Sequence, residues 1–404
     1  MSHDASEGQV RPGVPGLPLL AAVTRPWGVY IHVPFCASRC GYCDFNTYVL
    51  AAMGTDAVGA YLEAAHRELD LAAGRLGPGT PEVATVFFGG GTPTMLTPDQ
   101  IGGLVGHVES LWGLDDDAEV TTEANPETLD AQVLSGLLEA GITRLSMGMQ
   151  SADAGVLGLL ERRHTPGRAV EMARLARQVG FDDISLDLIF GTPGETLESW
   201  RASLEDALAG NPDHVSAYSL IVEEGTRFAA RVHRGELPMT DEDDLADKYL
   251  LTEEVLGGAG FVNYEISNWA RPRAGRDHHC RHNEGYWQGR AWWGIGPGAH
   301  SHLGDLRWWN LRHPHRYSQT LASGELPVEG WERLGPEEAH EEEVMLGLRT
   351  DHGVALDRFG PAETAVADRF VAEGLAARRD GRLVVTPAGR LLADRLVTEL
   401  LTAT

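Results

Sequence analysis

The sequence has few cysteines, no long apolar run and little positive charge. Only four of its 404 residues are cysteine, too few for a disulfide framework, which indicates a reducing compartment. No apolar segment approaches the roughly 18 residues that a membrane-spanning helix needs. Lysine and arginine number 33 against 59 acidic residues, a net charge of −26. This charge argues against non-specific nucleic-acid binding and against docking to anionic lipid by bulk charge.

The N-terminal segment also lacks the features of a signal peptide. Residues 1–24 have no basic region ahead of their short apolar patch, so they do not read as a signal peptide. Their glycine, proline and serine content predicts a disordered leader.

What the chain does contain is an alternation of short β-rich segments with segments of helical period over residues 25–255. The predicted strands are 27–33, 83–88, 118–124, 142–148, 183–190 and 213–220. This alternation predicts an α/β fold, a parallel sheet with helices outside it, and the strands are apolar on both faces, as covered strands are. An open doubly wound sheet and a full or partial barrel fit the periodicity equally well.

The pattern changes near residue 240. A long acidic helix is predicted over 239–260, and residues 261–270 alternate like a single antiparallel strand. This strand and a loop rich in histidine and tryptophan make up a region from 256 to 330. Residues 331–404 read as a small separate unit of helix, helix, strand and helix, which resembles a winged helix. Its acidic helices argue against a role in nucleic-acid binding, and they favour a domain that packs against the barrel or covers it as a lid.

Three of the four cysteines, Cys36, Cys40 and Cys43, lie within eight residues in "CASRCGYC". Zinc usually takes four ligands, often as two CxxC pairs, and this CxxxCxxC spacing has no partner pair. Buried structural thiols would not need to gather on a loop after a strand. An iron–sulfur cluster accounts for more, because a cubane cluster takes thiolates, normally four. Three local ligands would leave one iron open to a non-protein ligand.

The CxxxCxxC spacing resembles the signature of the radical S-adenosylmethionine (SAM) superfamily. The resemblance implies a [4Fe–4S] cluster on the three cysteines, with SAM bound to the open iron. In that superfamily, electron transfer from the cluster cleaves SAM to a deoxyadenosyl radical.

Polar residues recur where the predicted strands end. Glycines of "FFGGGTPT" follow the second strand and would let the backbone approach a ligand closely. Glu123 and Gln150 end the next two strands, and Asp187 lies in the fifth. A series of this kind indicates a ligand site at one end of a parallel sheet.

The superfamily resemblance assigns roles to this series. It implies SAM contacts at Tyr30, Gly90, Gly91, Thr92, Glu123, Gln150, Arg162 and Asp187, and it places Tyr42 at the aromatic position between the second and third cluster cysteines. One departure is "LERRHT", where relatives usually have glycine before the arginine.

Longer matches narrow the resemblance to one branch of the superfamily. "YIHVPFC", "RLSMGMQS", "DLIFGTPGET" and "SAYSLIVEEGT" are similar to the branch that contains oxygen-independent coproporphyrinogen III oxidases and HemW-type heme chaperones. The similarity runs from about residue 25 to the end. It implies a partial (β/α)6 barrel with a small C-terminal, mainly helical domain.

Two features discriminate between these functions. The oxidases usually carry a further cysteine in CxxxCxxCxC, where this chain has Phe45. The chaperones carry HNxxYW, which is present at residues 282–287. Imidazole is a common axial ligand of heme iron, and aromatic faces can flank a flat macrocycle. His282 is therefore the leading candidate for a heme contact, with neighbouring Cys280 either a ligand or inert.

The resemblance thus favours a heme chaperone that binds heme, the cluster and SAM. It implies delivery of heme to apoproteins such as those of the respiratory chain, by a cytoplasmic protein that can visit the membrane and can form a homodimer. The alternative is an enzyme that oxidatively decarboxylates coproporphyrinogen III to protoporphyrinogen IX. The sequence leaves open whether SAM is cleaved or only bound.

Overall fold

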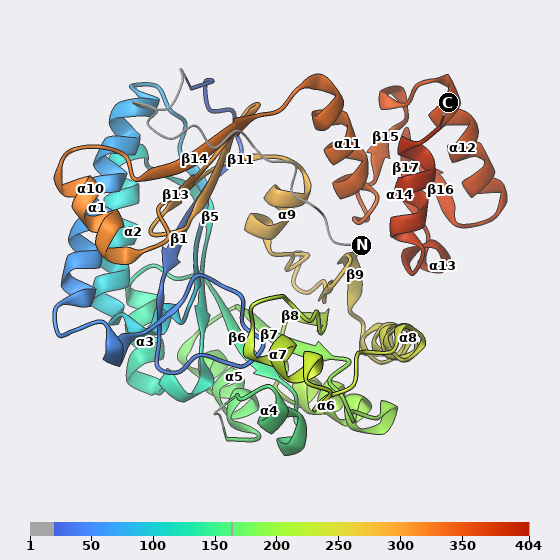
Figure 1. Ribbon diagram of the computed structural model, residues 1–404, viewed down its shortest axis with the longest axis horizontal. Helices are drawn as coiled ribbons and strands as arrows, with labels where there is room; N and C mark the ends of the chain where they lie inside the picture. Colours follow the sequence, from blue (N-terminus) through green and yellow to red (C-terminus); the bar gives the residue numbers. More distant parts are fainter. Residues whose placement is uncertain (1–19, 163–164, 404) are drawn as a thin grey trace.

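The structure is a computed structural model that describes residues 20–162 and 165–403. Within these residues, a curved sheet of 12 strands forms the centre of the molecule, with helices along its outer face (Figure 1). Neighbouring strands of the barrel run parallel in the order β1 (Trp27–Val33), β4 (Val83–Gly90), β5 (Leu114–Ala124), β6 (Arg144–Gln150), β7 (Asp183–Phe190) and β8 (His214–Ser219). The predicted leader lies, up to residue 19, outside the described residues.

The barrel is partial because β1 and β8, the first and last strands of this series, do not pair with each other. β1 pairs on its free side with β11 (Ala291–Ile295), and β8 pairs with β10 (Asn268–Ala270). Strands β1 and β7 are buried along nearly their whole length, as parallel strands covered on both faces are. The predicted partial (β/α)6 barrel is confirmed.

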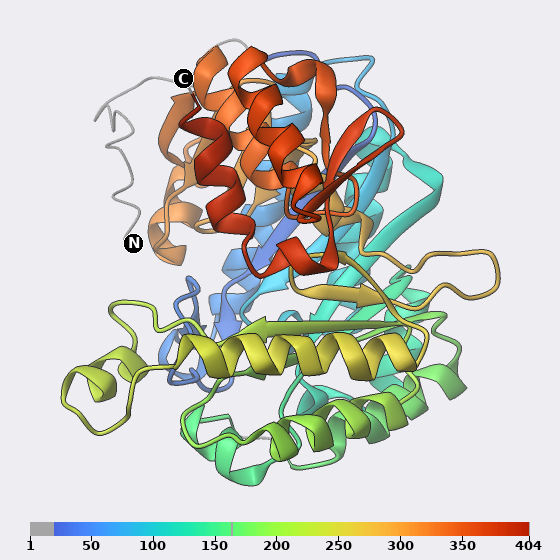
Figure 2. The same ribbon diagram turned by 90° about the vertical axis from the view of Figure 1, so that its right-hand side faces the viewer.

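The outer helices lie in the segments of helical period between and after the predicted strands. They are α1 (Ala57–Leu76), α2 (Pro98–Trp112), α3 (Ala131–Glu139), α5 (Arg168–Val179), α6 (Leu197–Ala209) and α8 (Glu242–Gly258), with short helices α4 (Ala154–Leu159) and α7 (Arg227–His233) in the loops after β6 and β8. Thr97 and Thr196 begin α2 and α6 with capping boxes, and each such cap contributes about 1 kcal/mol. Helix α8 lies alongside α6 (Figure 2).

The region after α8 differs from the prediction. The expected single strand is a hairpin of β9 (Val262–Glu265) and β10. Its turn is built by the Glu265 carboxylate, which accepts from the backbone N–H of Ser267 and from the side chain of Asn268. Polar side chains can make such a turn without glycine or proline. The alternation of polar and apolar residues therefore continues through the turn, and the sequence predicted one strand.

The prediction of a loop after this strand is also wrong. It contains helix α9 (Arg281–Trp287) and the strands β11, β12 (His300–Leu303) and β13 (Leu306–Asn310), followed by helix α10 (Pro314–Ala322) and strand β14 (Val328–Arg333). These strands extend the sheet beyond β1 in the order β11–β12–β13–β14. Tryptophan favours strands, and "AWWGI" and "LRWWN" supply it here.

The C-terminal residues form a winged-helix-like unit, as expected. Its elements are α11 (Pro336–Gly347), β15 (Val354–Ala355), α12 (Pro361–Ala372), β16 (Ala376–Arg379), β17 (Arg382–Val385), α13 (Pro387–Arg390) and α14 (Ala393–Leu401). Only β17 was predicted as a strand, but a three-stranded antiparallel sheet forms in the order β15–β17–β16. The unit has its own apolar core, which includes Val344, Phe370 and Leu400. In the described residues no helix has both the length and the apolarity to cross a membrane.

Candidate functional site

A cavity of about 790 Å³ lies on the inner side of the barrel strands, and we call it the cluster cavity. Every predicted site residue lines it: Tyr30, Cys36, Cys40, Tyr42, Cys43, Gly90, Gly91, Thr92, Glu123, Gln150, Arg162, Asp187 and His282. Residues up to 252 positions apart in the chain therefore meet at one site, because successive parallel strands present their inner faces to the same space.

The three neighbouring cysteines lie on a loop that follows β1. Cys36 belongs to the short strand β2 (Phe35–Cys36), which pairs with β3 (Tyr48–Val49) and closes the loop. Its thiol accepts from the hydroxyl of Thr92 at 3.8 Å, and the Cys40 thiol accepts from the Arg162 guanidinium at 3.7 Å. Burial raises the pKa of the Cys36 and Cys43 thiols. Donors aimed at sulfur favour the thiolate form that metals bind.

The spread of the thiols bears on the zinc alternative. Two sulfurs on one zinc ion can lie at most about 4.6 Å apart, because each Zn–S bond is about 2.3 Å long. In the described residues, the one group of three potential ligand atoms within 4.8 Å of one another is Asp183, Asp213 and His278. The three thiols are therefore spread more widely than the ligands of a single zinc ion, which favours a larger group.

The group formed by Asp183, Asp213 and His278 is neutralised by arginines. Asp183 is paired with Arg276, and Asp213 with Arg177 and Arg273. The guanidinium groups supply the positive charge that a metal cation would otherwise bring. We therefore interpret Asp183, Asp213 and His278 as part of an ion-pair network that connects elements of the fold.

The glycine-rich turn packs directly against the cysteine loop. The N–H groups of Gly91 and Thr92 donate to the carbonyls of Val33 and Phe35 at 2.8 and 2.7 Å. A Cβ atom on Gly91 would lie 2.5 Å from the Phe35 carbonyl oxygen, and one on Gly90, whose φ is +103°, would lie 2.3 Å from the His32 ring. Only glycine fits these two positions.

Two buried carboxyl groups face the cavity from β5 and β7. Glu123 accepts from the N–H of Gly90 at 3.1 Å, and burial raises its pKa to about 7. Asp187 accepts from the hydroxyls of Ser146, Ser185 and Ser216 at 2.7 to 3.3 Å. Burial raises the pKa of Asp187, while the three hydroxyl donors oppose that shift.

These three serines were not identified as site residues from the sequence. Each lies at an inward-facing position of a strand that is otherwise largely apolar. A polar residue at such positions of three consecutive strands was a readable signal of a shared partner.

Gln150 and Arg162 lie where β6 ends. Gln150 adopts a left-handed backbone conformation with a φ of 65°, a strained state that is often found at functional sites. Arg162 also donates to the carbonyl of Gly148 at 3.3 Å and so links β6 to the cysteine loop. Glu161, where relatives usually have glycine, has a φ of 53°, which explains why glycine suits the position.

The HNxxYW motif forms helix α9, which packs on β1 and β4 from the inner side of the sheet. The Glu119 carboxylate accepts from the N–H groups of Arg281 and His282 at 3.0 and 3.1 Å and so caps the helix. Cys280 precedes the helix, and its buried thiol lies 3.7 Å from Glu119. Burial raises the pKa of this thiol.

The imidazole of His282 is held from both sides. Its Nδ1 is 2.8 Å from the Thr85 hydroxyl, and its Nε2 is 2.8 Å from the Tyr286 hydroxyl. The ring stacks on Phe87 at 5.2 Å, and burial lowers its pKa to about 3. His282 is therefore a neutral ring whose two nitrogens are both engaged.

Comparisons with known proteins agree with this geometry. A family model of the radical SAM superfamily matches residues 30–207, and one of the HemN C-terminal domain matches residues 334–392. The chain is 48% identical over 386 residues to the heme chaperone HemW of Mycobacterium tuberculosis, covering 95% of this chain and 97% of the relative. It is 34% identical to HemW of Bacillus subtilis, covering 91% of this chain and 97% of the relative.

A mouse relative and a solved structure extend the comparison. The mitochondrial radical S-adenosyl methionine domain-containing protein 1 of Mus musculus is 35% identical, over 87% of this chain and 80% of the relative. The structure of coproporphyrinogen III oxidase HemN from Escherichia coli superposes with a TM-score of 0.77 at 24% identity, covering 94% of this chain and 90% of that one. That likeness shows a shared fold.

Proposed function

The chain belongs to the HemW family of the radical SAM superfamily, and from this premise we propose that it is a heme chaperone. In this proposal it binds heme, a [4Fe–4S] cluster and SAM, and delivers the heme to apoproteins such as those of the respiratory chain. The observation that carries the proposal against the oxidase alternative is Phe45. Its side chain stands at the position of the oxidase cysteine and is 58% exposed.

The residues of the cluster cavity suit an iron–sulfur cluster. Cys36, Cys40 and Cys43 would hold it, and Thr92 and Arg162 already donate to two of the sulfurs. Hydrogen bonds to the sulfurs and a nearby positive charge tune the potential of such a group. When bound, the cluster supplies an electron and an open iron site for SAM.

The surrounding groups suit a ligand that carries positive charge. Tyr30, Gly90, Gly91, Thr92, Glu123, Gln150, Arg162 and Asp187 are the proposed SAM contacts, with Tyr42 beside the cluster. The N–H groups of Gly90 and Gly91 are engaged within the protein, and the carboxyl groups of Glu123 and Asp187 offer acceptors to a ligand ammonium. Asp187, oriented by three serine hydroxyls, offers the carboxylate best placed to stay charged.

The oxidase function is the weaker candidate. The shared fold with HemN carries no information on the reaction, since one fold hosts many activities. Phe45 replaces a thiol with an apolar ring, which can neither ligate iron nor transfer a proton. The ring instead offers apolar surface where a porphyrin could pack.

The proposal includes the setting in which the protein works. We place it in the cytoplasm, with transient visits to the membrane where respiratory apoproteins are found, and with a homodimer as its assembled form. We propose no nucleic-acid partner, because a net charge of −26 argues against non-specific binding to phosphates.

Heme transfer tests the proposed function directly. The full chain, reconstituted anaerobically and loaded with heme, is mixed with a heme-free respiratory hemoprotein in the presence of a scavenger that captures free heme. We expect the recipient to gain its heme spectrum only when the loaded protein supplies the heme. Equal transfer from free heme under the same scavenger would refute the chaperone function.

A further inference from the structure

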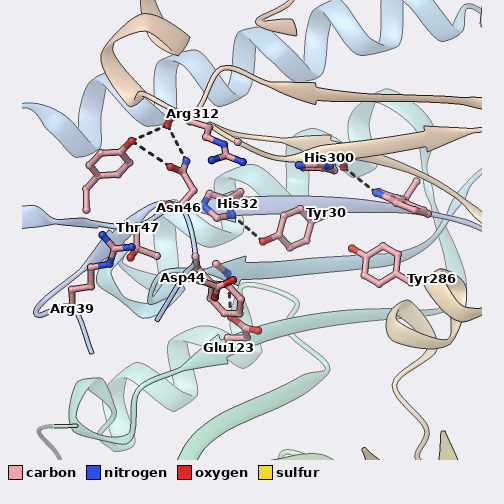
Figure 3. Close-up of a pocket in the computed structure, with 15 residues that line it drawn as sticks. Tyr30, His32, Arg39, Asp44, Asn46, Thr47, Glu123, Tyr286, His300 and Arg312 are labelled. Atoms are coloured by element: carbon pink, nitrogen blue, oxygen red, sulfur yellow. Dashed lines mark hydrogen bonds between the residues drawn. The ribbon is translucent and has the colours of Figure 1, made fainter. Parts of the chain in front are cut away.

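A second cavity adjoins the cluster cavity. It measures about 670 Å³, within the range of cofactor sites, and we call it the side cavity. The two cavities share eight lining residues, among them Tyr30, Phe45, Glu123 and Tyr286. A ligand in the side cavity would therefore lie next to a ligand in the cluster cavity. Figure 3 shows Arg39 at one end of the side cavity and Tyr286 at the other.

Histidine is the usual protein ligand of heme iron, and four histidines line the two cavities. Three of them have both ring nitrogens engaged. His32 contacts the Tyr30 hydroxyl and the Asn46 carbonyl, His214 contacts Ser185 and Tyr264, and His282 contacts Thr85 and Tyr286. In the part of the chain that the structure describes, the ring of His300 alone among the four makes no hydrogen bond.

His300 is also oriented and accessible. It begins β12 and pairs across the strands with Trp309 of β13. The two rings stack at 5.8 Å with an interplanar angle of 25°, and His300 is exposed. Partial burial and the nearby charges of Arg312 and Arg307 lower its pKa, so the imidazole is neutral at neutral pH, the form that binds iron.

The rest of the side cavity matches the other parts of a heme molecule. Arg39 and Arg312 bring guanidinium groups, which suit the two carboxylates of a porphyrin. The Arg312 side chain has no acidic partner among the described residues, and its backbone carbonyl accepts from Asn46 and Tyr48. Phe45 and Trp292 add aromatic surface for the macrocycle. Asp44 and Glu123 also line the cavity, and Figure 3 shows Glu123 on the side opposite His300 and Arg312.

We propose that the side cavity is the heme site, with His300 as the axial ligand of the iron and Arg39 and Arg312 as the partners of the propionates. This inference rests on the proposed heme-chaperone function and names the site within it. His282 then acts as a positioning residue, which holds the Tyr286 hydroxyl at the boundary between the two cavities.

Titrations of the full reconstituted chain with hemin and with iron-free protoporphyrin IX test this site. We expect His300→Ala and His300→Gln to weaken hemin binding about tenfold or more and to shift the Soret band, while protoporphyrin binding stays unchanged. Added imidazole should restore the wild-type Soret band. Arg312→Gln should weaken both ligands, because the propionates are common to them. His233→Ala, an exposed histidine on α7, is the matched control.

The outcomes separate this inference from the function on which it rests. Wild-type protein that binds no hemin would refute the chaperone function. Hemin binding by both His300 variants with wild-type affinity and spectrum would overturn the axial assignment and leave the function intact. An equal loss of hemin and protoporphyrin in both variants, with unchanged iron–sulfur absorbance, would assign His300 to packing and likewise overturn it.

Discussion

At the scale of single residues, the thiols and the carboxylates around the cluster cavity have separable roles. Replacing Cys36, Cys40 or Cys43 by serine should remove the cluster, because a hydroxyl is a poor substitute for a soft ligand. Cys280→Ser is the matched control, since this thiol precedes helix α9 and lies against Glu119 of β5. Iron analysis of reconstituted protein should give about four irons per chain for wild type and for the control. Loss of iron in the control would show that the ligand set is wrong.

Asp187 tests the SAM contacts. Asp187→Asn removes a charge that three serine hydroxyls orient, and it leaves the thiols in place. We expect SAM affinity to fall about ten- to a hundredfold with unchanged iron content. Equilibrium binding of SAM measures this, with the exposed Asp182→Asn as the control. Unchanged affinity would exclude Asp187 from the site.

Glu123 makes a prediction about pH. Its folded-state pKa of about 7 lies above the ordinary value of 4.5. Its contribution to stability is therefore fully present below about pH 4.5 and is lost as pH rises through 7. Glu123→Gln cannot ionise, so the variant should gain stability relative to wild type between pH 5 and pH 8. Urea unfolding of the wild-type and variant apoproteins at pH 5 and at pH 8 measures this gain. An equal difference in stability between the two proteins at both pH values would contradict the prediction.

At the scale of elements, Glu68 on α1 joins the barrel to the strands that extend it. Its buried carboxyl accepts from the N–H of Gly296 at 2.8 Å, and from the Asn310 amide and the Tyr317 hydroxyl at 2.6 Å each. Glu68→Gln places an amide donor against one of these donors. We expect this substitution to lower the free energy of unfolding by about 1–3 kcal/mol.

The matched control for Glu68 lies on the same helix. Glu63→Gln changes a side chain that is 67% exposed and should alter stability by less than about 0.5 kcal/mol. Urea unfolding midpoints compare the two variants. Equal shifts would mean that the buried carboxyl does not join α1 to these strands.

Secondary-structure elements were predictable from the sequence where a single pattern of apolar residues continued without interruption. Strands β1 and β7 begin and end at the predicted residues, because apolar runs bounded by turn residues mark covered strands. The β9–β10 hairpin was not predictable, because Glu265 makes its turn with side-chain hydrogen bonds. His300 was one histidine among several in the sequence. Its free ring and its stacking on Trp309 depend on the pairing of β12 with β13, which periodicity does not reveal.

At the scale of the whole molecule, the barrel brings the proposed iron–sulfur site into contact with an aromatic, arginine-bearing cavity. The sequence could predict the first, because three of its ligands are neighbours in the chain. It could not predict the second, because Phe45, Arg312 and His300 come from separate elements. The contact between the cavities links the proposed cluster chemistry to the proposed heme site.

The most direct test of the central claim compares heme binding with coproporphyrinogen turnover in one preparation. The full chain, reconstituted anaerobically with its cluster, is supplied with SAM and a working reductant. One half is titrated with heme, and the other is incubated with coproporphyrinogen III. We expect heme binding and no protoporphyrinogen IX, because Phe45 stands where the oxidases carry a cysteine. Turnover of coproporphyrinogen III would contradict the chaperone function and assign the chain to the oxidases.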